Sequence, residues 1–247
     1  MANGAPWHDQ DLLAFDLETT GIDRFEDVPV SYALVTVREG EVVDEDASLV
    51  DPARAIPPRA SAVHGITTER ARREGMGLGT AVRRIADALL GASRRGVPVV
   101  GMKLDYDLTM LDSCYRRETG RGLSDDGFCG PVLDALVIDR HVDRYRRGKR
   151  TLADLCAHYG VAIEHAHDAS ADAKAAADVV RALCERYPEL LASSPAELHV
   201  AQQSWHREWT ASFTEWRLRK GLSLEPGDDA GWPIASGALG AGAEVGV

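Results

Sequence analysis

A layered α/β fold with a mixed central sheet is the fold class that this sequence predicts. Two observations carry the prediction. Three β-rich stretches open the chain close together, and behind them helical and strand-like segments alternate. The predicted order is three strands, a helix, a strand, a helix, a strand and two helices. A helix followed by a strand indicates a crossover unit, which packs the helix on the sheet.

The first three strands are expected to form a meander. Residues 12–15 are a short apolar run that ends in acidic side chains. Residues 28–37 and 41–50 are two further β-rich stretches around a turn at residues 38–40. Strands that follow one another through so short a turn usually lie side by side in a sheet.

Helices and strands alternate over the middle of the chain. Residues 80–90 carry apolar side chains at helical spacing and lead into the buried-strand run of residues 97–100. Further elements are predicted as helices at residues 108–117, 152–159 and 171–187 and a short strand over residues 132–138.

The two ends of the chain differ from the middle. Residues 1–10 are expected to be a tail, and residues 11–192 one domain. Residues 193–222 are expected as a helical extension that packs back on this domain, because Leu198, Trp205 and Trp216 recur at roughly helical intervals. Residues 223–247 are rich in Gly, Ala, Ser and acidic residues, which predicts a mostly flexible tail anchored at Trp232.

The composition favours one sizeable core and gives no sign of export or membrane insertion. The chain has 247 residues, 45% of them hydrophobic. It lacks the run of about eighteen apolar residues that a membrane helix needs. The four cysteines lie far apart without C-x-x-C spacing, so they are expected to be reduced thiols of a cytoplasmic protein.

The charge balance argues at first against nucleic acid as a ligand. The formal net charge is -11, whereas Lys and Arg contacts to phosphate supply most of the affinity for nucleic acid. Two divalent ions in an acidic site would offset about four negative charges locally. Six cations also lie within residues 140–150. This segment is a solvated loop on its own, and a guide for a phosphate backbone if a phosphate-processing site lies nearby.

Two carboxylates stand together near the end of the first strand. Asp16 and Glu18 lie two residues apart in the motif FDLETTG, so both point to the same face of a strand. Like charges so close favour a cation between them, although an exposed pair or a turn cap shows the same pattern. Thr19, Thr20 and Gly21 suit the close approach of a ligand, or an ordinary turn.

A histidine and a further carboxylate precede the last helix of the domain. His167 and Asp172 are five residues apart, so they face one site only if His167 lies on the preceding loop. The positive end of the helix dipole would then keep Asp172 ionised and able to bind a metal ion. In the alternative, Asp168 or Ser170 caps the helix. His167 would then be a surface residue.

Another carboxylate follows the buried strand of residues 97–100. Asp107 stands where the next helix is expected to begin. Its alternative role is that of an N-cap, and Asp105 is its main rival for a metal ion. No other carboxylate shows a comparable pattern.

Together these segments resemble the DEDDh 3′-5′ exonuclease superfamily, which includes the proofreading subunit of bacterial replicative DNA polymerase and oligoribonuclease-like enzymes. The resemblance runs in order from about residue 12 to residue 183. The first motif is FDLETTG, the second is YDLTML at residues 106–111, and the third is HDASAD, from His167 to Asp172. Residues 56–67, which include Val63 and His64, resemble the substrate loop of the family.

The resemblance implies a ribonuclease H-like fold and a metal-dependent exonuclease domain over residues 11–192. Asp16, Glu18, Asp107 and Asp172 are implied as the ligands of two Mg²⁺ or Mn²⁺ ions, which prefer such hard oxygen donors. Asp16 would bridge both ions. His167 is implied as the general base, since its ordinary pKa lies near neutrality.

The implied substrate is the 3′ end of single-stranded nucleic acid, DNA in preference to RNA, with 5′-mononucleotides as products. Val63 and His64 are implied as contacts to the terminal nucleotide, beside the backbone of Thr19, Thr20 and Gly21. A proofreading or DNA repair role would follow. The alternative is a polymerase-associated proofreading or binding subunit that acts mainly through its C-terminal extension.

One segment departs from the family pattern. Residues 102–104 read Met-Lys-Leu, where the family commonly has His-Asn-Ala. The usual Asn helps to arrange the substrate and the site, so Lys103 is expected to alter the local geometry or the substrate preference.

Overall fold

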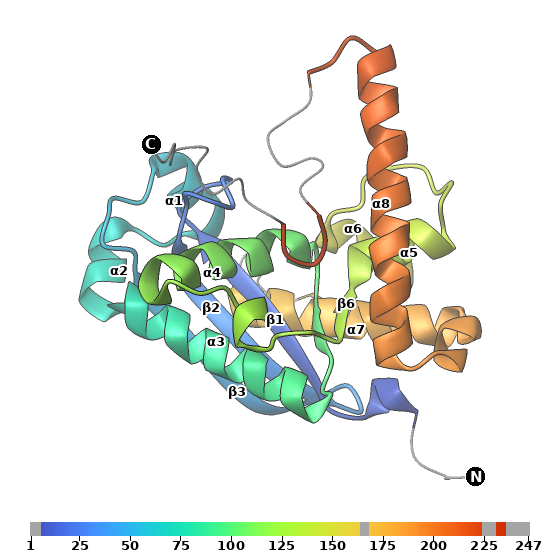
Figure 1. Ribbon diagram of the computed structural model, residues 1–247, viewed down its shortest axis with the longest axis horizontal. Coiled ribbons are helices and arrows are strands. Elements are labelled where there is room, and N and C mark those ends of the chain that lie inside the picture. The colour runs from blue at the N-terminus through green and yellow to red at the C-terminus, as the bar shows by residue number, and fades with distance from the viewer. Residues whose placement is uncertain (1–5, 164–167, 224–230, 236–247) are drawn as a thin grey trace, which may run out of the picture.

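A six-stranded sheet forms the centre of the molecule, with the strand order β4-β3-β2-β1-β5-β6 (Figure 1). The computed structural model describes residues 6–163, 168–223 and 231–235. The strands are β1 Leu12–Thr19, β2 Pro29–Arg38, β3 Glu41–Asp51, β4 Met76–Gly77, β5 Val99–Gly101 and β6 Val132–Asp134.

The sheet is mixed, as the sequence predicts. The first three strands pair in antiparallel fashion and form the expected meander. β5 pairs parallel to β1, β6 pairs parallel to β5, and β4 pairs parallel to β3. Because parallel strands run in the same direction, the carboxyl ends of β1, β5 and β6 meet at one edge of the sheet. Glu18 near the end of β1 and Asp134 at the end of β6 place carboxylates at this edge.

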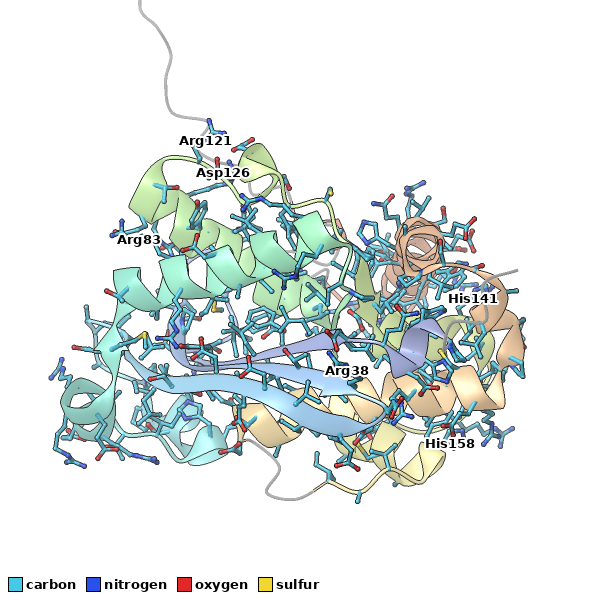
Figure 2. The ribbon with its side chains drawn as sticks, turned by 90° about the horizontal axis from the view of Figure 1, so that it is seen from below. Arg38, Arg83, Arg121, Asp126, His141 and His158 are labelled. Atoms are coloured by element: carbon cyan, nitrogen blue, oxygen red, sulfur yellow. The ribbon has the colours of Figure 1, made fainter. Side chains whose placement is uncertain are left out.

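Helices cover both faces of the sheet, which makes three layers (Figures 1 and 2). α3 Leu78–Arg95 and α4 Leu104–Thr119 lie on one face and enclose one hydrophobic core with the sheet. α6 Leu152–Tyr159 and α7 Ala169–Arg186 lie on the other face and enclose a second core. These four helices confirm the predicted ones, and α6 has the predicted bounds.

Residues 56–77 contain three elements that the sequence analysis did not predict. They are α1 Pro58–His64, α2 Thr68–Glu74 and β4. Each helix has only seven residues, and so short a helix gives little periodic signal. α1 ends at His64, and its C-cap Gly65 has a φ of 71°, in the left-handed region that favours glycine.

The predicted strand over residues 132–138 is wrong in its second half. β6 ends at Asp134, and α5 Ala135–Val142 follows. The Asp134 side chain accepts hydrogen bonds from the backbone N–H groups of Leu136 and Val137 and so caps the helix. A short apolar run fits a buried helix as well as a strand, so the pattern alone did not show this change.

The extra C-terminal helix is α8 Pro195–Arg219, which begins with a capping box between Ser194 and Glu197. Its first half packs back on the domain as expected, since Leu198 and Trp205 contact the core. The buried Gln202 side chain bonds to the backbone of β6.

The predicted anchor of the C-terminal tail is confirmed. Trp232 is buried, and its ring lies 5.3 Å from that of His199 on α8. The remaining residues of the expected flexible tail, 224–230 and 236–247, lie outside the described residues. Among the described residues, no helix is long and apolar enough to cross a membrane. All four cysteines are free thiols, and three are buried.

Candidate active site

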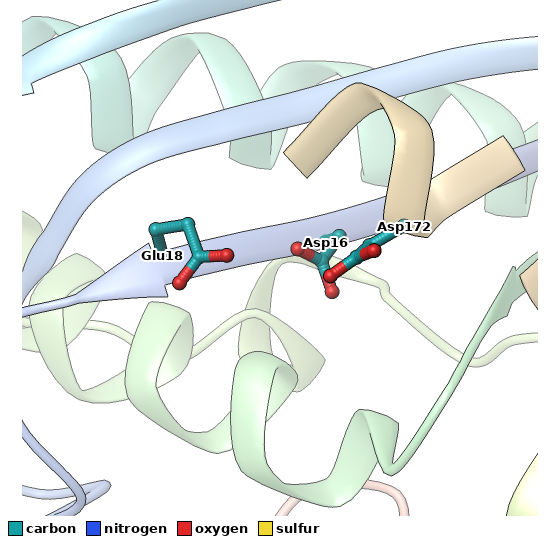
Figure 3. Close-up of side chains that lie close together, drawn as sticks. All are labelled: Asp16, Glu18 and Asp172. Atoms are coloured by element: carbon teal, nitrogen blue, oxygen red, sulfur yellow. The ribbon is translucent and has the colours of Figure 1, made fainter. Parts of the chain in front are cut away.

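The Asp16 and Glu18 side chains lie on one face of β1. Phe15 and Leu17 point into the core under α3 and α4, and side chains alternate along a strand. Asp16 and Glu18 therefore project to the opposite face, which α7 covers (Figure 3). The register between β1 and β2 shifts between Glu18 and Thr19, where the strand ends.

α7 brings Asp172 to the same place. Asp168 is the N-cap of this helix, and its side chain accepts hydrogen bonds from the N–H groups of Ser170 and Ala171. Asp172 lies in the first turn. One carboxylate oxygen from each of Asp16, Glu18 and Asp172 lies within 4.8 Å of the others (Figure 3). We call these three residues the acid cluster. Asp168 therefore caps the helix while Asp172 lies in the acid cluster, so these two assignments do not exclude each other.

Asp107 of α4 lies close enough to Asp16 for its charge to act on that carboxylate. Its side chain is buried, and Oδ1 accepts a hydrogen bond of 3.2 Å from the backbone N–H of Leu17. The alternative in which Asp107 caps the helix is wrong, because α4 begins at Leu104 and its N-cap is Lys103. Its rival Asp105 instead forms a 2.9 Å ion pair with Arg24, and both side chains are largely buried.

The carboxylates of this site repel one another. Burial raises the pKa of Asp16 well above its ordinary value, and the charges of Asp107, Glu18 and Asp172 raise it further. Burial, with the charges of Asp172 and Asp168, raises the pKa of Glu18 to about 7. Burial is also the main cause of the raised pKa of Asp107. A divalent cation would relieve this repulsion, and carboxylate oxygens are the donors that hard cations prefer.

A pocket of about 240 Å³ is lined by His64 and by Ser31, the residue of β2 that pairs with Glu18. Asp168 lines the same pocket, and its charge also acts on Asp16 and Glu18. His64 Nδ1 accepts a hydrogen bond of 3.1 Å from the N–H of Ile66. Val63, beside it on α1, is exposed. His167 lies outside the described residues, so its place at the site stays a prediction.

The segment from Thr19 to Gly21 forms a turn held by its own side chains. Thr20 is buried, and its hydroxyl donates to Asp27 at 2.7 Å, so this side chain helps to hold the turn. The Tyr106 hydroxyl contacts Thr19 Oγ1 and the Gly21 carbonyl. A substrate contact by the backbone of Thr19, Thr20 and Gly21 stays a prediction. Tyr106 was identified from the sequence only as part of the second motif, and no sequence pattern predicted its contact with Thr19 and Gly21.

Lys103 has an unusual backbone conformation next to the site. Its φ is 62°, in the left-handed region, where Asn is tolerated better than Lys. The side chain is exposed, and its ammonium nitrogen lies 5.8 Å from the centre of the Tyr106 ring. The family's common Asn would adopt this conformation at lower cost, so Lys103 costs conformational energy at the start of α4.

The basic segment of residues 140–150 is only partly available to a ligand. Arg146 and Arg150 both pair with the fully buried carboxylate of Asp139, which also accepts a hydrogen bond from Tyr159. These two arginines therefore stabilise the fold, which corrects the expectation that the whole segment guides a phosphate backbone. Arg144, Arg147 and Lys149 are exposed.

A mixed sheet between helical layers, with an acid cluster at the carboxyl edge of its parallel strands, is an α/β architecture suited to binding a divalent cation. Residues 13–180 match the family model of the RNase T exonucleases. The chain belongs to this family, and it is therefore an enzyme of the DEDD 3′-5′ exonuclease group, whose members use divalent metal ions.

Similar proteins agree with this family. The chain is 28% identical over 173 residues to the PolC-type DNA polymerase III of Lacticaseibacillus paracasei, a match that covers 70% of this chain and 11% of the polymerase. Exonuclease I of E. coli, solved with a dA16 oligonucleotide, shares the fold with a TM-score of 0.62 and 20% identity, over 74% of this chain and 42% of that one. Exonuclease I of Methylocaldum szegediense gives 0.58 and 24%, over the same shares.

The chain thus spans about a tenth of the polymerase and about two fifths of the exonuclease I chains. The likeness to the solved structures establishes the fold. It does not carry their substrates or partners over to this chain.

Proposed function

We propose that this chain removes nucleotides one at a time from the 3′ end of single-stranded nucleic acid, DNA in preference to RNA, and releases 5′-mononucleotides. The observation that carries this proposal is the acid cluster, in which Asp16, Glu18 and Asp172 converge from two elements. Exonuclease I, which shares the fold, has been solved with single-stranded oligonucleotides. This supports a single strand as substrate.

The metal ions of the proposed site are two Mg²⁺ or Mn²⁺. Asp16, Glu18 and Asp172 would hold one ion, and Asp16 with Asp107 the second. Their donor set contains oxygen atoms and no thiol or imidazole, which suits hard cations. The bound ions would neutralise charge on the phosphoryl oxygens and on the leaving 3′ oxygen.

The chain's own residues would orient the reacting groups. His167 precedes Asp168, the N-cap of α7, and Asp168 acts electrostatically on Asp16 and Glu18. This supports His167 as the general base that accepts a proton from the attacking water. The water oxygen bonds to phosphorus as the bond to the 3′ oxygen breaks, and the terminal nucleotide leaves with the phosphate at its 5′ position.

The 3′ end would be held in the pocket that His64 lines. Val63 is 55% exposed, so it is available to stack on a base. A terminal 3′-phosphate would add charge beside Asp168 and the acid cluster, where negative charge is already crowded. Such a block is expected to inhibit strongly.

A 5′-labelled single-stranded oligonucleotide tests the proposal. With Mg²⁺ or Mn²⁺, the purified chain should shorten it from the 3′ end without any partner, and excess chelator should stop the reaction. A matched D16N preparation controls for contaminating nucleases. Internal cuts, digestion from the 5′ end, indifference to a 3′-phosphate or full activity in chelator would contradict the proposal.

A polymerase-associated subunit is the second candidate. One observation supports this candidate. The segment of the PolC-type polymerase that matches this chain is 11% of that polymerase, so the similar segment there belongs to a larger enzyme. The two candidates differ in one outcome. Activity that appears only after a DNA polymerase is added would favour the subunit.

A further inference from the structure

The two halves of α8 differ in their surroundings. The first half packs on β6 and α5, as described above. The second half rises beyond the layered body (Figure 1), yet it carries three aromatic residues at helical spacing. Trp209 and Phe213 stack at 4.8 Å between ring centres, and Phe213 and Trp216 stack at 5.7 Å. None of the three belongs to the hydrophobic cores.

We call Trp209, Phe213 and Trp216 the ring row. A groove of about 390 Å³ lies between the ring row and the end of α5. Arg144 and Tyr145 form the opposite wall, and Tyr145 is 88% exposed. Trp209 and Phe213 form the α8 wall. The volume is within the usual range for small-ligand sites, so individual nucleotides can enter. A nucleobase between Tyr145 and the ring row would have an aromatic partner on each side.

The groove is cationic in a chain whose net charge is -11. Arg140 lies over the Trp209 ring, 3.3 Å from its centre, and Arg144 lines the groove near it. Burial lowers the pKa of Arg140 to about 10, so it stays charged at neutral pH. Glu208 is the acid in the lining of the groove. Two cations beside flat aromatic rings suit a phosphate backbone with unpaired bases.

Hydrogen bonds connect the middle of α8 to the start of α4. Gln202 of α8 accepts a hydrogen bond from the N–H of Asp134 at the end of β6, and the Asp134 carboxylate accepts hydrogen bonds from the N–H groups of Lys103 and Leu104. The middle of α8 therefore lies close to the start of α4, which carries Asp107. A strand whose 3′ end occupies the acid cluster could pass from there along α8.

We propose that the groove between α5 and α8 binds the substrate strand upstream of its 3′ end, with bases stacked against Tyr145 and Phe213 and phosphates near Arg140 and Arg144. This inference rests on the proposed function, because it assigns a second contact to the same substrate. It assigns a role in substrate affinity to the C-terminal extension. Oligonucleotides too short to reach the groove should not benefit from it.

Cleavage rates for dT3 and dT12 test the groove. Tyr145→Ala should lower kcat/KM for dT12 by about tenfold, because stacking on one aromatic ring typically contributes about 1–3 kcal/mol. The rate for dT3 should stay within about twofold of wild type. Tyr145 is 88% exposed, so its removal leaves the fold intact. Arg144→Ala should behave in the same way, and its kcat/KM for dT12 should fall less steeply with salt than that of wild type, because one phosphate contact is lost.

Two matched variants on α8 serve as controls. Arg207 lies about 160° around the helix from Trp205 and Trp209, so Arg207→Ala removes an equal charge outside the groove. Leu218→Ala removes an exposed apolar side chain. Both should cleave dT12 at the wild-type rate.

Different outcomes separate this inference from the proposed function. If wild type cleaves dT12 and Tyr145→Ala and Arg144→Ala do so equally well, the groove proposal is overturned and the exonuclease proposal stands. Equal losses on dT3 and dT12 would also overturn it. If wild type cleaves neither oligonucleotide, the proposed exonuclease function is contradicted, and the groove proposal that rests on it is contradicted as well. A dimer that Tyr145→Ala dissociates, measured by sedimentation, would assign the groove to a second copy of the chain.

Discussion

Two buried groups of charges in this chain are built in opposite ways. Around Asp139, a fully buried carboxylate is neutralised by Arg146 and Arg150 and bonded to Tyr159. Around Asp16, a carboxylate is surrounded by Asp107, Glu18 and Asp172. The first group satisfies its charge within the protein, whereas the second brings like charges together that an external cation would neutralise.

This difference indicates that the acid cluster, and not the group around Asp139, is the functional site. A fold tolerates a buried charge when partners compensate it, and the Asp139 group therefore needs no ligand. The acid cluster raises the pKa values of its own members, which costs stability in the absence of metal. Perturbed groups of this kind concentrate at functional sites.

The largest expected effect separates the two groups by activity. D16N should lower the cleavage rate by roughly a thousandfold or more, because losing bound metal removes several kcal/mol of charge stabilisation. D172N should act similarly. Initial rates on a labelled single strand, at saturating Mn²⁺, measure the loss. A near-normal rate in D16N would show that the ligands are misassigned.

The general base should contribute the next largest effect. His167→Ala should lower kcat by roughly two to four orders of magnitude, the usual range for a positioned base. The pH profile of kcat should also lose its step near neutrality, since the unperturbed pKa of histidine is about 6.5. His165→Ala is the matched control, because this histidine lies two residues away. Equal losses in the two variants would contradict the assignment.

Removing the compensated acid should affect stability instead. Asp139→Asn leaves Arg146 and Arg150 without their carboxylate, and breaking such a buried pair typically costs about 3–5 kcal/mol. Urea unfolding measures this loss. The folded fraction should cleave at the wild-type rate. Unchanged stability would show that the two groups do not differ as described.

The smallest expected effect is a pH dependence of the metal-free protein. The folded pKa of Glu18 is raised to about 7 from an ordinary value near 4.5. The folded state therefore binds this proton more tightly than the unfolded state. Its contribution to stability is present below about pH 4.5 and is lost as pH rises through about 7.

In chelator, the melting temperature should accordingly fall between about pH 5 and pH 7.5, and Glu18→Gln should flatten this part of the profile. Saturating Mn²⁺ should flatten it as well, because bound cations stabilise the charged form. A wild-type melting temperature that rises over this interval, with no difference from Glu18→Gln, would contradict the predicted direction of the pH dependence.

Local signals made much of this molecule predictable. Asp16 and Glu18 are two residues apart on a strand, and Asp172 opens a helix, so their faces followed from elementary geometry. The order of the larger elements followed from periodicity in the same way. The Asp107 position came from the resemblance, because its neighbour Asp105 looks the same in sequence and only the structure shows that Arg24 pairs with it.

The remaining features depend on contacts that a linear pattern does not show. The basic segment of residues 140–150 was predicted to guide a phosphate backbone, but two of its arginines form ion pairs with Asp139. The helix that starts at Ala135 depends on the Asp134 cap within an apolar run. Trp205 and Trp209 belong to one helical stripe and both line the groove, yet Trp205 also contacts the core whereas Trp209 does not.

Mn²⁺ binding to the purified chain, followed by isothermal titration calorimetry, tests most directly whether the acid cluster is a metal site. Wild type should bind two ions per chain in a saturable way, and D16N should lose this binding. Glu74→Gln, which removes a surface carboxylate paired with Arg70 and Arg73, should leave it unchanged. Failure of the wild-type chain to bind Mn²⁺, or equal binding by D16N, would contradict the assignment of the acid cluster as the catalytic metal site.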